Sequence, residues 1–221
     1  MKAEELTFLK EDVLSMGRSV EQALLEMIRM LKHEENANLS FVEEQEERIN
    51  DQCQKIEEKC LDLLVEREPM NAKTIRSLVS IIIIATKLER MADHALRVSK
   101  VADWAREEEI EVPPELIEMS QAIQRMVRET LLGFLTDAPD KAIDVVQRDN
   151  RVDYLHDVLS KRLLTELGAQ DSATAQMRAQ FLFCTRFLER MGDACTSIAK
   201  RVYFIATGQR LKPHPSKVVE L

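Results

Sequence analysis

The chain has 221 residues, of which 45% are hydrophobic, 32% are charged and only 5% are aromatic, and its formal net charge is -8. The negative charge argues against nucleic-acid binding, because neutralising phosphates requires a basic face and the sequence contains no run of Lys or Arg. With five Gly, six Pro and an apolar content carried by Leu, Ile, Val, Ala and Met, the composition favours a helix bundle over a β-sandwich.

The N-terminal third of the chain predicts two helices. The stretch MKAEELTFLK is too acidic and too interrupted for a signal peptide, so we expect a cytoplasmic protein. Apolar residues recur every three or four positions over 6–31, which predicts a first amphipathic helix. Ser40 and Glu43 have the spacing of a capping box, which predicts that a second helix begins there and continues to about Arg67.

A third helix is expected from Asn71 or Thr74 to about Arg106. It contains the β-branched run 79–85, which by propensity alone would favour a strand. The flanks are helical for more than a turn on each side, and a helix that is apolar all round is typical of the buried member of a bundle. We therefore predict a helix. The apolar run is also shorter than the 18 or so residues of a membrane span, so no membrane insertion is expected.

The segment Val112-Pro113-Pro114 predicts a boundary, because proline suits the first turn of a helix but not its interior. Three further helices follow, at about 115–135, 137–168 and 172–207, with Gly168 and Gly208 as C-terminal caps and Asp171 or Ser172 as the last N-terminal cap. The predicted organisation is a first unit over 1–111, a second over 112–208 and a loosely ordered tail over 209–221.

The two halves share a repeat. Glu89-Arg-Met-Ala-Asp93 recurs 100 positions later as Glu189-Arg-Met-Gly-Asp193, each time at the end of an apolar run. The segments 48–50 and 151–153 correspond at an offset of 103, which places Glu46 opposite Asp149. The sequence therefore predicts an all-α fold of two antiparallel three-helix bundles related by an internal pseudo-twofold axis.

The repeated motif places two carboxylates on one helical stripe, because residues four apart are neighbours on a helix. Like charges there repel unless a basic side chain or a metal cation lies between them. Arg97 follows Asp93 by one turn and can form an intrahelical ion pair, whereas the matching position in the second repeat is Ser197. There, Arg186 and Arg190 precede the acids by three residues.

The fifth predicted helix adds Asp149 and Asp153, again four residues apart. If its stripe faces that of the sixth helix, four carboxylates converge, and bundles use such sets to bind hard or borderline cations. His94 and His156 are available as nitrogen ligands. The alternative interpretation of each acidic pair is a solvated charged face. The candidate metal ligands are Glu89, Asp93, Asp149, Asp153, Glu189 and Asp193.

The sequence contains no signature of an enzyme. A glycine-rich phosphate loop, GxSxG, HExxH and a nucleophilic Cys/His pattern are all absent, and the nearest approach to a ferritin-like Glu-x-x-His pair is Asp153 with His156. The four cysteines show no CxxC spacing, so reduced structural thiols are expected.

The repeated motif and the helices that precede it, four segments in all, resemble the PhoU family of accessory proteins for phosphate uptake and phosphate signalling. LERMADHALRVSKVA and LERMGDACTSIAKRVYFIATG are similar to the family signature LERIGDHAxNIAE, which occurs twice in its members. EERINDQCQKIEEKCLDLLVEREP and RDNRVDYLHDVLSKRLL are similar to its paired-helix segments. The resemblance covers nearly all of residues 1–210 and implies a twin three-helix bundle that is usually a homodimer.

The resemblance further implies a non-enzymatic negative regulator that couples the ATPase subunit of a phosphate ABC transporter to a sensor histidine kinase. It implies that the six carboxylates above hold clusters of iron or zinc. The chain departs from the signature at Arg97 and Ser197, where the family has Asn, and at Lys100 and Lys200, where it has Glu. A metal-buffering bundle, and an accessory subunit of an unrelated transporter or kinase, are the alternative hypotheses.

Overall fold

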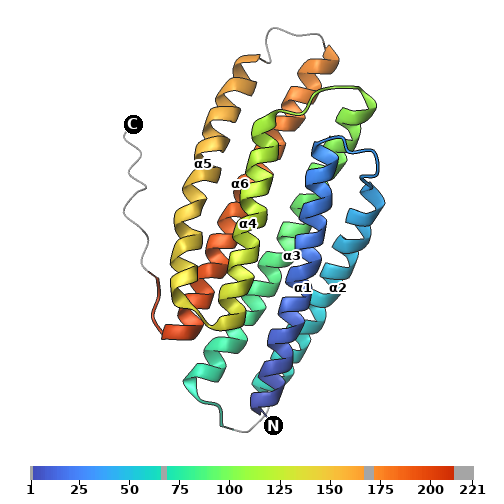
Figure 1. Cartoon of the computed structure of the whole chain (residues 1–221). Coiled ribbons are helices and arrows are strands. Elements are labelled where there is room, and N and C mark those ends of the chain that lie inside the picture. The colour runs from blue at the N-terminus through green and yellow to red at the C-terminus, as the bar shows by residue number, and fades with distance from the viewer. Residues whose placement is uncertain (1, 66–68, 167–171, 212–221) are drawn as a thin grey trace.

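The computed structural model describes residues 2–65, 69–166 and 172–211 and contains six long helices (Figure 1). They are α1 (Lys2–Leu31), α2 (Leu39–Val65), α3 (Ala72–Glu107), α4 (Pro114–Thr136), α5 (Pro139–Glu166) and α6 (Ser172–Thr207). No strand occurs in these ranges. The run 79–85 lies inside α3, so the prediction of a helix over this β-branched segment is confirmed.

The start of α2 differs from the prediction. Asn38, and not Ser40, satisfies the free backbone at this end, because its side-chain oxygen accepts the Ser40 N–H at 2.9 Å. The helix begins at Leu39, so Ser40 and Glu43 lie within it and the predicted capping box is wrong. The start of α3 agrees with the first of the two predicted positions, since Asn71 is the N-cap and accepts the Thr74 N–H at 2.9 Å.

The ends of the second-half helices also follow from local chemistry. Pro114 stands in the first turn of α4, where its missing N–H leaves no hydrogen bond unmade. Gly208 closes α6 with φ +72°, a conformation that glycine adopts without strain, and its N–H donates to the Phe204 carbonyl. The predicted caps at Gly168 and Asp171, and residues 212–221 of the predicted tail, lie outside the described residues.

The helices form two antiparallel bundles, α1 to α3 and α4 to α6, in which each helix contacts the other two (Figure 1). Between the bundles, α3 contacts α6 and α1 contacts α4, while α2 and α5 lie at opposite outer edges. The predicted architecture of two three-helix bundles with internal pseudo-twofold symmetry is thus confirmed. The buried helices α3 and α6, which carry the repeated motif, lie side by side in the middle of the molecule.

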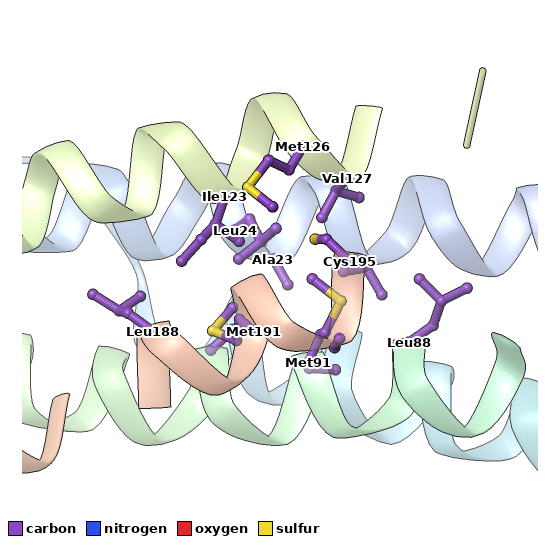
Figure 2. Close-up of a cluster of buried hydrophobic side chains, with 14 of the residues drawn as sticks. Ala23, Leu24, Leu88, Met91, Ile123, Met126, Val127, Leu188, Met191 and Cys195 are labelled. Atoms are coloured by element: carbon purple, nitrogen blue, oxygen red, sulfur yellow. The ribbon is translucent and has the colours of Figure 1, made fainter. Parts of the chain in front are cut away.

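One continuous hydrophobic core joins the two bundles. Buried side chains from all six helices belong to a single cluster. At its centre, Leu88 and Met91 of α3 and Leu188, Met191 and Cys195 of α6 face apolar side chains of α1 and α4 (Figure 2). Because these residues cover one face of α3 and α6, the acidic motif residues are directed to the other side of both helices.

All four cysteines are free and buried. Burial raises the pKa of Cys53, Cys60 and Cys184 to about 12 and also raises that of Cys195. Only the thiolate reacts with alkylating reagents. We therefore expect no alkylation of the folded protein by iodoacetamide at about pH 8, and four alkylated thiols after unfolding in guanidinium, as measured by intact mass. Rapid modification of any thiol in the folded protein would contradict this assignment.

Candidate functional site

In the first bundle, α2 and α3 bring Glu46, Glu89 and Asp93 into one electrostatic group. Burial raises the pKa of Glu89, and the negative charge of Asp93 raises it further. Burial likewise raises the pKa of Glu46, and the negative charge of Asp93 is again the next largest cause. The sequence predicted the repulsion between Glu89 and Asp93 within α3, and the structure adds repulsion from Glu46 of α2.

Basic side chains offset part of this repulsion. The Arg97 Nε lies 3.0 Å from Asp93 Oδ1 and 3.1 Å from Oδ2, which confirms the predicted intrahelical ion pair. Lys100 Nζ lies 3.5 Å from Glu43 Oε1 of α2. Both residues at which the chain departs from the family signature in the first repeat therefore form ion pairs with acids.

The second bundle is arranged differently, because one of its carboxylates is buried. Asp149 of α5 is only 6% exposed and lies against the α6 backbone at Gly192. A Cβ at Gly192 would come within 2.7 Å of Asp149 Oδ1, so the glycine of the second motif makes room for this carboxylate. Glu189 Oε2 is 3.3 Å from Arg186 Nη1, and Asp193 is exposed.

The six predicted metal ligands thus fall into two groups, one in each bundle. Arginine already neutralises one member of each repeated pair, Asp93 and Glu189. Within the described ranges, no set of three His, Cys, Asp or Glu side chains is placed to hold one metal ion. This arrangement falls short of the ligand count that hard cations take, so the metal site stays a prediction.

Between the motifs of α3 and α6 lies a cavity of about 800 Å³, which we name the α3/α6 cavity. Its basic lining residues are Lys87, Arg90 and Arg97 from α3 and Arg190 and Lys200 from α6. The two carboxylates in its wall are Asp93 and Asp193. His94 stacks on Phe187 across the two helices, with ring centroids 5.3 Å apart, and burial lowers the pKa of His94.

The sequence identified the acids of this cavity and the nearby bases Arg97, Arg190 and Lys200, but it did not predict that bases from the two helices line one space. Lys87, Arg90, His94 and Arg97 follow one another at three- and four-residue spacing, which places them on one face of α3. On a single helix this spacing is also typical of a solvated charged face. Only the packing of α3 on α6 brings Arg190 and Lys200 opposite them.

Replacing Glu89 with glutamine is expected to raise the melting temperature at about pH 7. Burial and Asp93 raise the pKa of Glu89 in the folded protein, so its ionised form is disfavoured there. An acid with a raised folded pKa contributes stability that is complete below its unfolded pKa and is lost as pH rises through the folded pKa. The gain should therefore disappear below about pH 4. Glu44→Gln, at an exposed position of α2, is the control.

Comparison with known proteins identifies the fold and the repeat together. The model of the PhoU domain matches the chain twice, over residues 13–102 and 116–202. The chain belongs to the PhoU family. The two matches correspond to the two bundles and include both copies of the acidic motif, so the predicted resemblance is confirmed.

Members of the PhoU family match nearly the whole chain. A phosphate-specific transport system accessory protein PhoU homolog of Zymomonas mobilis is 31% identical, and the alignment covers 94% of this chain and 87% of that protein. A homolog of the same name from Clostridium acetobutylicum is 26% identical over 94% of both chains. The crystal structure of PhoU from Pseudomonas aeruginosa superposes with a TM-score of 0.88 at 27% identity, covering 95% of this chain and all of the other.

The family assignment gives the coarse function of the relatives, which are named as accessory proteins of phosphate-specific transport. None of the helices in the described ranges is both long and apolar enough to cross a bilayer.

Proposed function

We propose that the chain is a non-enzymatic negative regulator of phosphate uptake and of phosphate-responsive signalling in the cytoplasm. It would bind the ATPase subunit of a phosphate ABC transporter and a sensor histidine kinase, and it would do so as a homodimer. The observation that carries the proposal is the match of the PhoU domain to both halves of the chain, together with the names of its full-length relatives.

The surface of the helices supports a role in protein binding. Aromatic residues are few in this chain, yet Phe8, Tyr154 and Phe183 are 63%, 57% and 58% exposed. Aromatic side chains are enriched among the residues that dominate the binding energy of protein interfaces. These three residues come from α1, α5 and α6, so exposed aromatic side chains are present on both bundles.

Two experiments test this proposal. Deletion of the gene should raise phosphate uptake in phosphate-replete cells, because a negative regulator is lost. In a pull-down, the tagged chain should capture the transporter ATPase subunit, and Asp substitution of Phe8, Tyr154 or Phe183 should lower capture at least tenfold at one of the three positions. Arg48→Gln and Arg125→Gln, at exposed polar positions, are the controls. Unchanged uptake together with no capture would contradict the regulatory role.

Metal binding is the second candidate function, and the mutual repulsion of Glu46, Glu89 and Asp93 is the observation that favours it. Burial is the main reason that the pKa values of Glu46 and Glu89 are raised, and a cation there would relieve the like-charge repulsion that raises them further. Elemental analysis of protein purified without chelator separates the two functions. Less than one tightly held metal ion per chain would exclude metal buffering, and one or more iron or zinc ions per chain would support it.

If metal is bound, Asp193→Ala should weaken its binding in the second bundle more than Asp93→Ala does in the first. The reason is that Arg97 already forms an ion pair with Asp93, whereas the matching position near Asp193 is the neutral Ser197. Calorimetric titration of each variant with zinc measures this difference. Equal losses would show that Arg97 does not affect metal binding.

A further inference from the structure

The α3/α6 cavity has a charge opposite to that of the protein. The chain carries a net charge of -8, yet the cavity lining contains five Lys or Arg residues and two Asp. The basic residues come from both repeats, and Arg90 and Arg190 occupy equivalent positions in the two copies of the motif. Two helices that are 100 residues apart in sequence therefore direct positive charge toward a common space.

Most of this positive charge is not held in close ion pairs, and among the unpaired residues Arg90 lowers the pKa of a neighbouring acid, Glu89, against the larger effect of burial, which raises it. Arg97 is paired with Asp93, but among the described residues Lys87, Arg90, Arg190 and Lys200 form no ion pair within 4.0 Å. Unpaired cations that converge on a cavity repel one another, and an anion placed between them would remove that repulsion.

The basic region continues beyond the main cavity. A second hollow of about 220 Å³ shares Ser197 and Lys200 with the α3/α6 cavity and adds Arg201 and Arg210. The combined space is elongated along α6, because its lining runs from Phe187 to Arg210. Its main part, at about 800 Å³, has the size of cavities that hold small organic or multiply charged ligands.

We propose that the α3/α6 cavity binds a small anion that carries several phosphate groups. Arginine guanidinium groups bind phosphate oxygens through two parallel hydrogen bonds, and the lysine ammonium groups add charge. The one phenylalanine in the lining, Phe187, is stacked by His94 and lies 5.7 Å from the Arg97 guanidinium. Because five of the lining residues are Lys or Arg, recognition is directed at the phosphate chain. This binding site goes beyond the regulatory function, because it requires no partner protein.

Calorimetric titration of the purified full-length chain with tripolyphosphate tests the site directly. We expect saturable binding at about 50 mM salt that weakens severalfold at about 300 mM, because the interaction is between partly exposed charges. ATP should bind with an affinity similar to that of tripolyphosphate, adenosine should not bind, and orthophosphate should bind much more weakly. Binding of adenosine, or orthophosphate affinity equal to that of tripolyphosphate, would overturn the assignment of a phosphate-chain site.

Matched charge variants locate the binding. The double variant R90Q/R190Q removes two exposed arginines that line the cavity, and R48Q/R125Q removes two exposed arginines that do not. We expect the first to weaken tripolyphosphate binding by tenfold or more and the second by less than twofold, although their net charges are equal. Equal effects would show that only the overall charge matters and would refute the site. Circular dichroism melting of all variants confirms that the fold is retained.

Asp193→Asn should change anion affinity and cation affinity in opposite directions, so it distinguishes the two kinds of site. Asp193 lines the cavity as one of its two carboxylates, so its neutralisation should tighten tripolyphosphate binding about threefold. A metal site at the same residue would instead lose affinity for zinc. Weaker tripolyphosphate binding in this variant would contradict the proposal, whatever the fate of the proposed regulatory function.

Discussion

Phe181→Ala is expected to lower the free energy of unfolding by about 3–5 kcal/mol. Phe181 lies in α6, is fully buried and belongs to the core cluster that joins the two bundles. Removing its ring takes away the burial energy of an aromatic side chain and leaves a cavity that the surrounding helices fill only in part. Urea unfolding followed by circular dichroism at 222 nm or so measures the change.

Phe183 provides the matched control for this prediction. It lies on the same helix two residues further on, but it is 58% exposed. Phe183→Ala should therefore change the free energy of unfolding by no more than about 0.5 kcal/mol. Equal losses at both positions would mean that the ring of Phe183 is covered in solution, for example by a second copy of the chain, and would remove Phe183 from the set of exposed aromatic residues.

Gly192→Ala is expected to lower the free energy of unfolding by about 1–3 kcal/mol, although alanine is usually the better helix former. The new Cβ would lie 2.7 Å from Asp149 Oδ1 and 3.3 Å from Val152 Cγ1, so α5 and α6 must separate or the buried carboxylate must move. The substitution recreates the sequence of the first repeat, in which Ala92 stands at this position. Thermal and urea unfolding of the variant measure the effect.

A double-mutant cycle assigns this effect to Asp149. In an Asp149→Ala background, the closest of the two contacts is absent, so Gly192→Ala should be less destabilising by about 1 kcal/mol or more. Val152 remains in both backgrounds and accounts for the residual effect. Strict additivity of the two substitutions would show that the carboxylate does not determine why the second motif contains glycine.

Most of the fold could be predicted from local sequence signals. The error in that prediction also has a local cause. The three- and four-residue spacing of apolar residues determines which face of each helix is buried, and the prolines at the start of α4 mark where the second bundle begins. The predicted start of α2 was wrong because Asn38 and Ser40 are equally good capping residues. In the structure, Asn38 follows a turn in which His33 adopts φ +53°, and no sequence pattern specifies that turn.

The candidate site could be predicted only in part from the sequence, because some of its features depend on how the helices pack. The repeat predicted the position of the acids and the ion pair of Arg97 with Asp93, because both are properties of a single helix. The burial of Asp149 and the convergence of Arg90 with Arg190 depend on the spacing and rotation of packed helices. In the linear sequence, Arg190 is simply a charged residue beside Glu189, and nothing indicates that it faces α3.

The continuous core between the bundles has a mechanical consequence. Because α3 packs on α6 and α1 packs on α4 through one shared cluster, the two repeats cannot hinge apart without exposing that cluster to water. The separation between the two motif-bearing helices is therefore preorganised. Any signal sensed between these helices must reach other proteins through altered charge or small side-chain movements at a rigid surface, and not through opening of the molecule.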